Sequence, residues 1–423
     1  MFYLYGRRSV RTNLEGDSHM KLNVSSCLLL MGVVSLPIFA QRPSPQWVAT
    51  FEASPASYDL PIPKDAMGFT GPVTGTLRYR FGISVGGSRI VVSLSNELGN
   101  KPLKIAGASI AVAGDEMNAA PGTIRRLTFN GKESIEIPPG APILSDPVEI
   151  EVASMSDLLC SVFVKEPIGL SPMGGASMVL TDGDTLLSEK LAEARKVTSR
   201  PVVTSVLVTP AQPTRVVVAL GDSITDGVRE KPSEPHGWVA TLAARMNAEQ
   251  KSSGMAAVSA GISGNQILKS MMGPAALSRV DRDVFSIPGL GYVVLLEGIN
   301  DIGFSGKTPF GAGASLPLED LLTGYKQIAV RAHTRGVKIF VGTLLPAEGA
   351  FYFSDDKEKL RHAVNAWIRT SKDFDGVIDF DAVIRDPAHP TRMKAGFDSG
   401  DHLHPNSAGY RVMGEAINLS MFR

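Results

Sequence analysis

The hydrophobic pattern of the chain changes at a proline-containing segment, residues 209–213, and this change constrains the fold more than any other feature. Before it, short stretches alternate apolar and polar residues between glycine-rich turns, which is typical of antiparallel strands with one buried face. After it, continuous apolar runs alternate with stretches of helical spacing, as buried parallel strands with crossover helices require. We therefore expect an antiparallel β-sandwich domain over residues 46–208 and an α/β domain over residues 214–423.

Short strands dominate the first half. The pattern predicts strands at residues 76–81, 89–95, 103–112, 134–137, 148–152 and 158–164. The first two flank Gly86 and Gly87, a pair typical of a tight turn, so we expect these two strands to form a β-hairpin.

Strands and helices alternate in the second half. Apolar runs predict strands at residues 215–220, 256–260, 292–296, 337–341 and 377–380, and helical spacing predicts helices at 238–247, 275–283, 318–334, 357–370 and 407–418. This alternation indicates a parallel sheet with helices on both faces. Ligands bind such sheets beyond the carboxyl ends of the strands, so the segments that follow the strands are where a site is expected.

Four of these segments carry polar residues that suit acyl transfer. Ser223 follows the first strand, Gly264 the second, Asn300 the third, and Asp401 with His404 the last. A serine hydroxyl becomes nucleophilic when a histidine takes its proton, and a carboxylate can hold that imidazole in the required tautomer. Because Asp401 and His404 are three residues apart, a tight turn would let their side chains meet.

An ester carbonyl under attack develops negative charge on its oxygen, which needs preorganised hydrogen-bond donors. The backbone N–H groups of Ser223 and Gly264 and the side-chain amide of Asn300 are the candidates, and glycine at 264 lets the backbone approach a substrate without a Cβ. We expect Glu297 and Asp301 to hold the Asn300 segment by hydrogen bonds rather than to touch substrate.

The order of these segments resembles a known family. Gly-Asp-Ser-Ile-Thr at residues 221–225, the segment around Gly264, Gly-Ile-Asn-Asp at 298–301 and Asp-x-x-His at 401–404 are similar to the sequence blocks of the SGNH (GDSL-type) hydrolase superfamily. The resemblance extends from Arg215 to the end of the sequence. It implies a flavodoxin-like three-layer α/β/α fold and hydrolysis of carboxylic esters without a metal or cofactor.

The same resemblance implies roles for five residues. Ser223 would be the nucleophile, Gly264 and Asn300 oxyanion donors beside the Ser223 N–H, Asp401 the residue that orients the base, and His404 the base.

Two further comparisons with the family concern single stretches. Ile224 stands where the family usually has leucine, a mild departure. In the first half, Gly-Gly-Ser-Arg at residues 86–89 and Leu-Ser-Asn-Glu at 94–97 resemble the N-terminal module of secreted bacterial two-domain members.

Other residues compete for the base and its partner. His402 is adjacent to Asp401, where side chains usually diverge, so His404 is the preferred base. Asp398 is an alternative to Asp401. Asp386 and His389 repeat the same spacing without the surrounding block.

Three other short motifs match known functional patterns, but we do not expect them to have those functions. Gly-x-Ser-x-Gly at residues 82–86 lacks the strand-to-helix turn of a nucleophile elbow. Ser354 and Lys357 fit the Ser-x-x-Lys pattern of β-lactamase-type enzymes, but Ser354 directly precedes a helical stretch, so we expect it to be the N-cap of that helix. Gly-Lys-Thr at 306–308 lacks the earlier glycine of a phosphate-binding loop.

A leader is expected at residues 1–40. Met20-Lys21, the apolar run at 27–39 and a small residue before a proline-rich stretch are typical of a secretory signal peptide, so we expect a secreted or periplasmic protein. Residues 1–19 precede this signal and are attributed to an upstream start codon assigned in error or to an expression remnant. The apolar run is too short for stable membrane insertion. Removal of Cys27 with the leader would leave Cys160 alone, without a disulfide partner in the chain.

The charge balance and the number of cysteines argue against nucleic-acid binding and against a zinc cluster. Lys plus Arg and Asp plus Glu each number 42, so the net charge is zero, and nucleic-acid binding is not expected. Two cysteines cannot form a zinc cluster by themselves.

The sequence therefore predicts a secreted serine esterase in which Ser223 is acylated and water releases the acyl group. The expected substrate is a small-molecule or polysaccharide ester, with carbohydrate deacetylation and lipolysis both open. An acyltransferase with the same residues and a non-catalytic binding protein are the alternatives.

Overall fold

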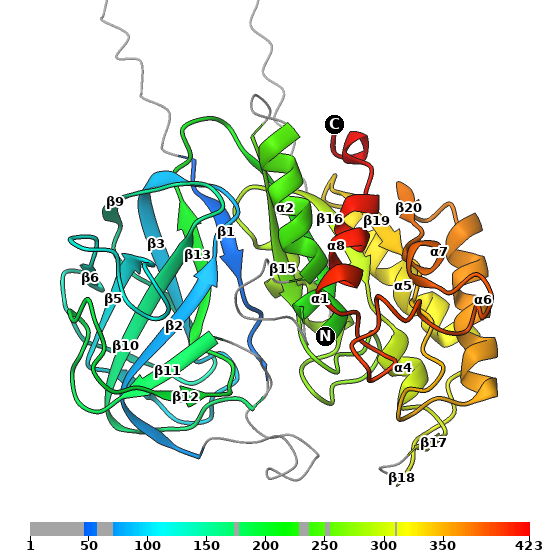
Figure 1. Cartoon of the computed structure of the whole chain (residues 1–423), viewed down its shortest axis with the longest axis horizontal. Coiled ribbons are helices and arrows are strands. Elements are labelled where there is room, and N and C mark those ends of the chain that lie inside the picture. Colours follow the sequence, from blue (N-terminus) through cyan, green and yellow to red (C-terminus); the bar gives the residue numbers. More distant parts are fainter. Residues whose placement is uncertain (1–45, 57–70, 173–176, 228–236, 250–253, 309–310) are drawn as a thin grey trace, which may run out of the picture. The chain divides into compact units, whose positions relative to one another are not determined.

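The computed structural model of the chain describes residues 46–56, 71–172, 177–227, 237–249, 254–308 and 311–423. The predicted leader lies outside these residues. Residues Pro45–Arg423 form one compact unit. Antiparallel sheets occupy its first part and a parallel sheet its second part, on either side of residues 209–213 (Figure 1). In the described part of the chain, no helix combines the length and apolar character needed to cross a membrane.

The parallel sheet has five strands in the order β15-β14-β16-β19-β20. Its strands are β14 (Arg215–Gly221), β15 (Met255–Gly261), β16 (Leu290–Leu296), β19 (Lys338–Gly342) and β20 (Gly376–Ile378). This is the flavodoxin-like order, in which the first strand lies inside the sheet. Every residue of β14 after Arg215 is buried, so both faces of the sheet are covered. The predicted α/β class with a parallel sheet is confirmed.

Helices pack against this sheet and against one another (Figure 1). They are α1 (Ser223–Asp226), α2 (Gly237–Glu249), α3 (Ala276–Val280) with a π-helical turn at Asp281–Phe285, α4 (Ile299–Gly303), α5 (Leu318–His333), α6 (Asp355–Thr370), α7 (Phe380–Ile384), α8 (Ser407–Ala416) and a 3-10 turn at Leu419–Phe422. Helix α2 packs on β15 and on α8, while α5 packs on β19 and contacts α3 and α6.

Two large antiparallel sheets and one small one form the first part of the chain. One contains β1 (Val48–Glu52), β13 (Val203–Val208), β3 (Gly87–Ser95), β8 (Pro142–Leu144) and β9 (Val148–Val152). The other contains β12 (Arg195–Val197), β11 (Ser177–Thr181), β2 (Val73–Gly82), β10 (Asp157–Ile168), β5 (Gly107–Val112) and β6 (Arg125–Leu127). The sheets meet where the ring of Phe51 on β1 contacts Phe81 on β2, with centroids 4.3 Å apart.

The predicted hairpin between β2 and β3 is wrong. β2 pairs with β10 and β11 in one sheet, whereas β3 pairs with β13, β8 and β9 in the other. The glycines between them serve close approach rather than a hairpin turn, because a Cβ at Gly86 would lie 2.2 Å from the carbonyl oxygen of Val152. The segment therefore connects the two sheets.

The prediction of a single strand at residues 103–112 is wrong as well, because this stretch forms two strands. β4 (Leu103–Ile105) pairs with β7 (Ile135–Ile137) in a small sheet, and β5 follows in the larger one. A short hairpin, β17 (Lys307–Thr308) with β18 (Gly311–Ala312), follows α4. Ser354 is the N-cap of α6, as predicted, and accepts a hydrogen bond from the backbone N–H of Lys357.

Two hydrogen bonds, each donated by a backbone N–H group of an edge strand, join the antiparallel part to the α/β part. The backbone N–H of Ala257, on β15, donates to Ser84 Oγ at 2.9 Å. The backbone N–H of Ala49, on β1, donates to the carbonyl oxygen of Pro288 at 3.0 Å. These bonds satisfy backbone groups that an uncovered edge would leave to solvent or to another chain.

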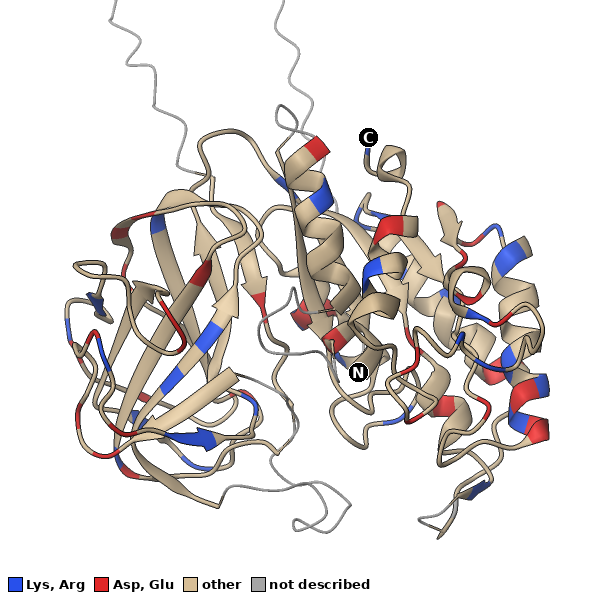
Figure 2. Cartoon of the chain, in the orientation of Figure 1, with Lys and Arg blue, Asp and Glu red and all other residues tan. Residues whose placement is uncertain are grey.

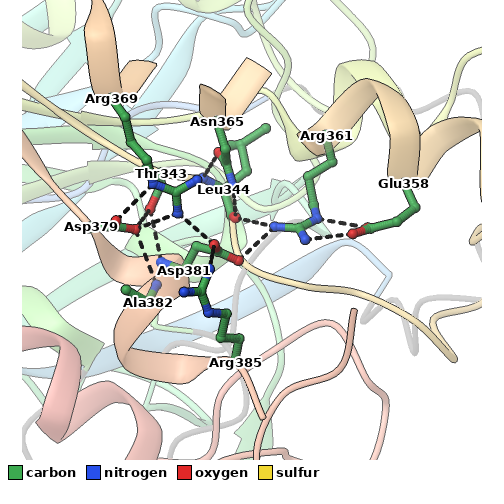
Figure 3. Close-up of polar contacts among 10 residues, drawn as sticks. All are labelled: Thr343, Leu344, Glu358, Arg361, Asn365, Arg369, Asp379, Asp381, Ala382 and Arg385. Carbon is green, nitrogen blue, oxygen red and sulfur yellow. Dashed lines mark hydrogen bonds and ion pairs between the residues drawn. The ribbon is translucent and has the colours of Figure 1, made fainter. Parts of the chain in front are cut away.

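Basic and acidic residues are interspersed along the described elements (Figure 2). A cluster of them lies beyond the carboxyl end of β19, where Asp381 of α7 accepts hydrogen bonds from three arginines (Figure 3). Arg361 donates to it at 2.9 Å, Arg369 at 2.6 Å and Arg385 at 3.1 Å. Arg361 also donates to the carbonyl oxygen of Leu344. The cluster thus fastens α6 and α7 to the loop after β19.

Replacing Asp381 by Asn should destabilise the fold, because the side chain of Arg361 is 5% exposed and would lose a buried counter-charge. We expect the free energy of unfolding, measured by urea titration, to fall by about 3 kcal/mol. Asp356→Asn is the control, since Asp356 pairs with Lys359 at the surface and its loss should change stability little. Equal effects of the two substitutions would contradict this account.

Candidate active site

Ser223 is the first residue of α1, directly beyond the end of β14. The side chain of Asp222 caps this helix by accepting the backbone N–H of Ile224 at 2.9 Å. Gly221, before the cap, lies against the backbone of the neighbouring strand, since a Cβ there would be 2.4 Å from the carbonyl oxygen of Leu296. The serine is therefore fixed at a sharp strand-to-helix turn, with 6% of its surface exposed.

The structure brings His404 and Asp401 to this serine. Nε2 of His404 lies 2.7 Å from Oγ of Ser223, and Nδ1 lies 2.8 Å from Oδ2 of Asp401. The other carboxylate oxygen of Asp401 accepts the backbone N–H groups of Leu403 and His404. Partial burial raises the pKa of Asp401, but these hydrogen bonds and the imidazole outweigh it and hold the pKa below its ordinary range.

An ionised Asp401 decides the tautomer of the histidine. A carboxylate can only accept, so Nδ1 of His404 carries the proton and donates to Asp401. Nε2 then has its lone pair directed at the hydroxyl of Ser223. This arrangement lets the imidazole take the serine proton.

The residues that compete with His404 and Asp401 for the roles of base and orienting carboxylate make other contacts. Nδ1 of His402 bonds Asp398 at 2.6 Å, and the side chain of His402 is 52% exposed. Its backbone has a φ of +61°, in the left-handed region that few residues other than glycine adopt. Asp386 accepts the backbone N–H of Ala388. The structure thus brings together the preferred pair, Asp401 and His404, with Ser223.

Gly264 lies in the loop that follows β15. Gly221 pairs with Gly261 on one side and with Leu296 on the other, so the segments that carry Ser223, Gly264 and Asn300 all begin at one level of the sheet edge. Gly264 has a φ of +72°, and a Cβ on it would lie 2.5 Å from Cγ of Met272. Both its conformation and its surroundings therefore require glycine.

Asn300, on α4, has a fixed amide orientation. Its Nδ2 donates to the carbonyl oxygen of Asn265 at 3.1 Å, and the hydroxyl of Tyr352 donates to its Oδ1 at 3.3 Å. One hydrogen of the amide group is used in the first bond, which leaves the second for another acceptor. The same bond ties Asn300 to the residue next to Gly264.

The two acidic residues beside Asn300 behave differently. Asp301 accepts the backbone N–H groups of Ile267 and Leu268 and so ties the Asn300 segment, as expected, to the loop after β15; burial outweighs these bonds and raises its pKa to about 6. The expectation for Glu297 is wrong, because neither of its carboxyl oxygens has a hydrogen-bond partner among the described residues. Burial and the nearby Asp222 raise the pKa of Glu297 well above its ordinary value. Burial likewise raises the pKa of Asp222 to about 7.

Sequence reasoning missed two residues that hold the site. Arg279, on α3, is fully buried and donates to the carbonyl oxygens of Gly221 and Ala260 and to Oδ1 of Asn265. Tyr352 orients Asn300. Arg279 lies in a stretch that also holds Asp281, Arg282 and Asp283, so no local pattern marked it, and none marked Tyr352. Within the described residues, no group of three or more His, Cys, Asp or Glu side chains is arranged to hold a metal ion.

The unpartnered Glu297 makes stability depend on pH. The folded chain keeps the proton of Glu297 where the unfolded chain releases it, so its contribution to stability falls as pH rises above the ordinary range of glutamate. Glu297→Gln should therefore gain stability relative to the natural chain on going from pH 5 to pH 8, by at most about 1.4 kcal/mol per pH unit. Urea titrations at each pH measure this difference.

Asp301→Asn is the matched control. It also removes a buried carboxyl group, but one that accepts two backbone N–H groups, so the variant should lose stability. A Glu297→Gln variant destabilised to the same extent at every pH would mean that Glu297 is bonded in solution.

Comparison of the chain with known protein families gives one match. Residues 219–412 match the family model described as the GDSL-like lipase/acylhydrolase family. A search of curated proteins found no match.

Solved structures similar to the chain include three from bacteria. One, named a putative lipolytic protein of the G-D-S-L family, comes from Desulfitobacterium hafniense and is 23% identical, with a TM-score of 0.36, over 48% of this chain and 97% of that one. A GDSL-like lipase from Bacteroides thetaiotaomicron is 19% identical, with a TM-score of 0.37, over 49% and 87%. A variant of an acetyl xylan esterase from Geobacillus stearothermophilus is 21% identical, with a TM-score of 0.40, over 49% and 94%.

The matched stretch, residues 219–412, begins on β14 and ends within α8, so it includes Ser223, Gly264, Asn300, Asp401 and His404. Residues 219–412 therefore form a domain of the GDSL-like lipase/acylhydrolase family, and the chain is a carboxylic ester hydrolase.

Proposed function

We propose that the chain hydrolyses carboxylic esters through an acyl-enzyme on Ser223. The observation that carries this proposal is the continuous hydrogen-bond chain from Ser223 Oγ through His404 to Asp401. Asp401 stays ionised because its pKa is lowered, so it stabilises the imidazolium that forms when His404 takes the serine proton.

The reaction proceeds in two halves. Oγ of Ser223 attacks the ester carbonyl while Nε2 of His404 accepts its proton, and the tetrahedral intermediate then expels the alcohol, which leaves with that proton. His404 then takes a proton from a water molecule, which attacks the acyl-enzyme. The second tetrahedral intermediate collapses, Ser223 recovers a proton from His404, and the carboxylic acid leaves.

The oxyanion of both intermediates needs fixed donors. We assign them to the backbone N–H groups of Ser223 and Gly264 and to the second hydrogen of the Asn300 amide, which its bonds to Asn265 and Tyr352 leave unused. Each such donor is worth about 3 kcal/mol of transition-state stabilisation.

We further propose that the natural substrate is a short-chain ester carried by a carbohydrate. The ring of Phe351 is 52% exposed and lies 4.4 Å from that of Tyr352, which contacts Asn300. An exposed aromatic ring next to the residue that orients Asn300 would suit a sugar ring that bears an acetyl group.

The first part of the chain and the leader complete the proposal. We infer that the two antiparallel sheets form an accessory β-sandwich domain, supported by the ring contacts between β1 and β2. We also propose that the protein is exported, supported by the leader pattern at residues 20–42.

Substitutions in the proposed catalytic group should separate chemistry from folding. Ser223→Ala should lower kcat for p-nitrophenyl acetate by about 10⁵-fold, because the nucleophile is lost, and leave the thermal midpoint nearly unchanged. His404→Ala should have a similar effect on kcat.

His402→Asn is the matched control, since His402 also pairs with an aspartate, and asparagine tolerates its left-handed backbone. It should keep kcat within about twofold. Near-natural turnover in Ser223→Ala, or loss of turnover in His402→Asn instead, would refute the assignment.

A series of p-nitrophenyl esters from acetate to palmitate tests the substrate class, run beside acetylated xylan with acetate release as the readout. We expect acetate to give the highest kcat/KM and xylan to release acetate. Faster turnover of palmitate would indicate a lipolytic enzyme, and ester products formed with added alcohol would indicate an acyltransferase. Turnover of p-nitrophenyl acetate without acetate release from xylan would exclude acetylated xylan.

A further inference from the structure

Arg200, between β12 and β13 in the antiparallel part of the chain, reaches the site of the hydrolase domain. Its Nε donates to the carbonyl oxygen of Ser54 at 2.6 Å, and one terminal nitrogen donates to the carbonyl oxygen of Gly261 at 2.8 Å. The other terminal nitrogen lies 3.1 and 3.0 Å from the two carboxylate oxygens of Asp226. The side chain of Arg200 is 6% exposed, so these acceptors replace nearly all of its water.

The acceptors of Arg200 lie beside the catalytic residues. Asp226 is the last residue of the helix that begins with Ser223, and Gly261 ends the strand that leads into the Gly264 loop. Oδ2 of Asp226 also accepts the hydroxyl of Ser263, at 3.0 Å. A continuous polar path therefore runs from Arg200 through Asp226 to the residue before Gly264.

A second arginine binds the same strand ends from the hydrolase domain itself. Arg279 donates to the carbonyl oxygens of Ala260 and Gly221 and contacts Ser54 Oγ at 3.4 Å. Ser54 thus accepts from both arginines, through its backbone to one and through its hydroxyl to the other. The loop that carries Gly264 is held partly by residues from outside the matched family domain.

We propose that Arg200 is a positioning residue for the esterase reaction, which makes the antiparallel part of the chain a component of the oxyanion site. The inference rests on the proposed function, because it assumes that the Gly264 N–H stabilises the oxyanion. Arg200 acts through Asp226, Ser263 and Gly261 and does not contact the reacting atoms. Without the guanidinium group, Gly261 and Asp226 lose a shared donor, and the start of the Gly264 loop is held less firmly. A shift of the Gly264 N–H by a fraction of an ångström weakens its hydrogen bond to the oxyanion in the transition state.

Side chains of graded similarity at position 200 test this role. Arg200→Met removes the donors and should lower kcat for p-nitrophenyl acetate by roughly 10- to 100-fold, less than complete loss of an oxyanion donor. KM should change by less than about threefold, because the interaction is realised in the transition state. Arg200→Lys keeps the charge but not the planar fork and should have an intermediate kcat.

Arg78→Met is the matched control for loss of a buried arginine. Arg78 lies on β2, is buried like Arg200, and donates to Ser161 Oγ and to the carbonyl oxygens of Met117, Thr185 and Ser188. Its loss should lower the thermal midpoint while kcat, measured well below that midpoint, stays within about twofold of the natural value.

A double-substitution cycle with Ser263→Ala tests the path itself. Because Arg200 and Ser263 both act through Asp226, the effects of the two substitutions on kcat should be less than additive. A chemical-rescue experiment uses the Arg200→Ala variant. Guanidinium at millimolar concentration should restore part of the kcat that this variant loses.

The outcomes distinguish this inference from the proposed function. An inactive natural chain, or an active Ser223→Ala variant, would overturn the proposed function. An active natural chain whose Arg200→Met and Arg200→Lys variants keep kcat would overturn the inference alone. An equal kcat loss in Arg78→Met, or strictly additive effects in the cycle, would likewise overturn it. If Arg200→Met fails to fold, Arg200→Lys and the guanidinium experiment decide in the same way.

Discussion

The contact between Ser223 Oγ and His404 Nε2 joins residues 181 positions apart, and the rest of the site depends on it. Neither residue could hold the other in place by itself. Ser223 is fixed by the end of β14, and His404 is fixed by the loop before α8, which packs closely on α2: a Cβ at Gly414 would lie 2.7 Å from the carbonyl oxygen of Trp238. Arg245 of α2 strengthens this contact by donating to the carbonyl oxygens of Gly414, Glu415 and Ile417. The distance between base and nucleophile is therefore set by helix packing.

Much of the hydrolase half could be predicted because its signals are local. A strand buried on both faces needs a continuous apolar run, so β14, β15 and β16 are recognisable without knowledge of their neighbours. The turn that joins Asp401 to His404 is also local, since the aspartate accepts backbone N–H groups two and three residues later. Short helices such as α4 and α7 escaped prediction because five residues carry too little periodicity.

Features that depend on distant partners could not be predicted in this way. The two strands around Gly86 look like a hairpin, yet the glycine is required by Val152 O, which is far away in the sequence. Tyr352 and Arg279 matter through what they bond, and a tyrosine or arginine in a sequence does not reveal its acceptors. For Glu297 the sequence suggested a hydrogen-bonding role, whereas the fold buries its carboxyl group without a partner among the described residues.

The protonation of the acidic residues around Ser223 explains how such a crowded site can favour an oxyanion. Negative charge near the nucleophile would oppose the charge that develops on the substrate. Burial raises the pKa of Glu297 well above its ordinary value and that of Asp222 to about 7, so both carboxyl groups keep their protons to a higher pH than exposed carboxyl groups do. Asp401 differs from these two residues: hydrogen bonds lower its pKa, and its charge lies behind the imidazole, where it stabilises the proton that His404 takes. The fold thus lowers the pKa of the carboxyl group behind the base and raises the pKa of Asp222 and Glu297, which favours transfer of the serine proton and limits repulsion of the intermediate.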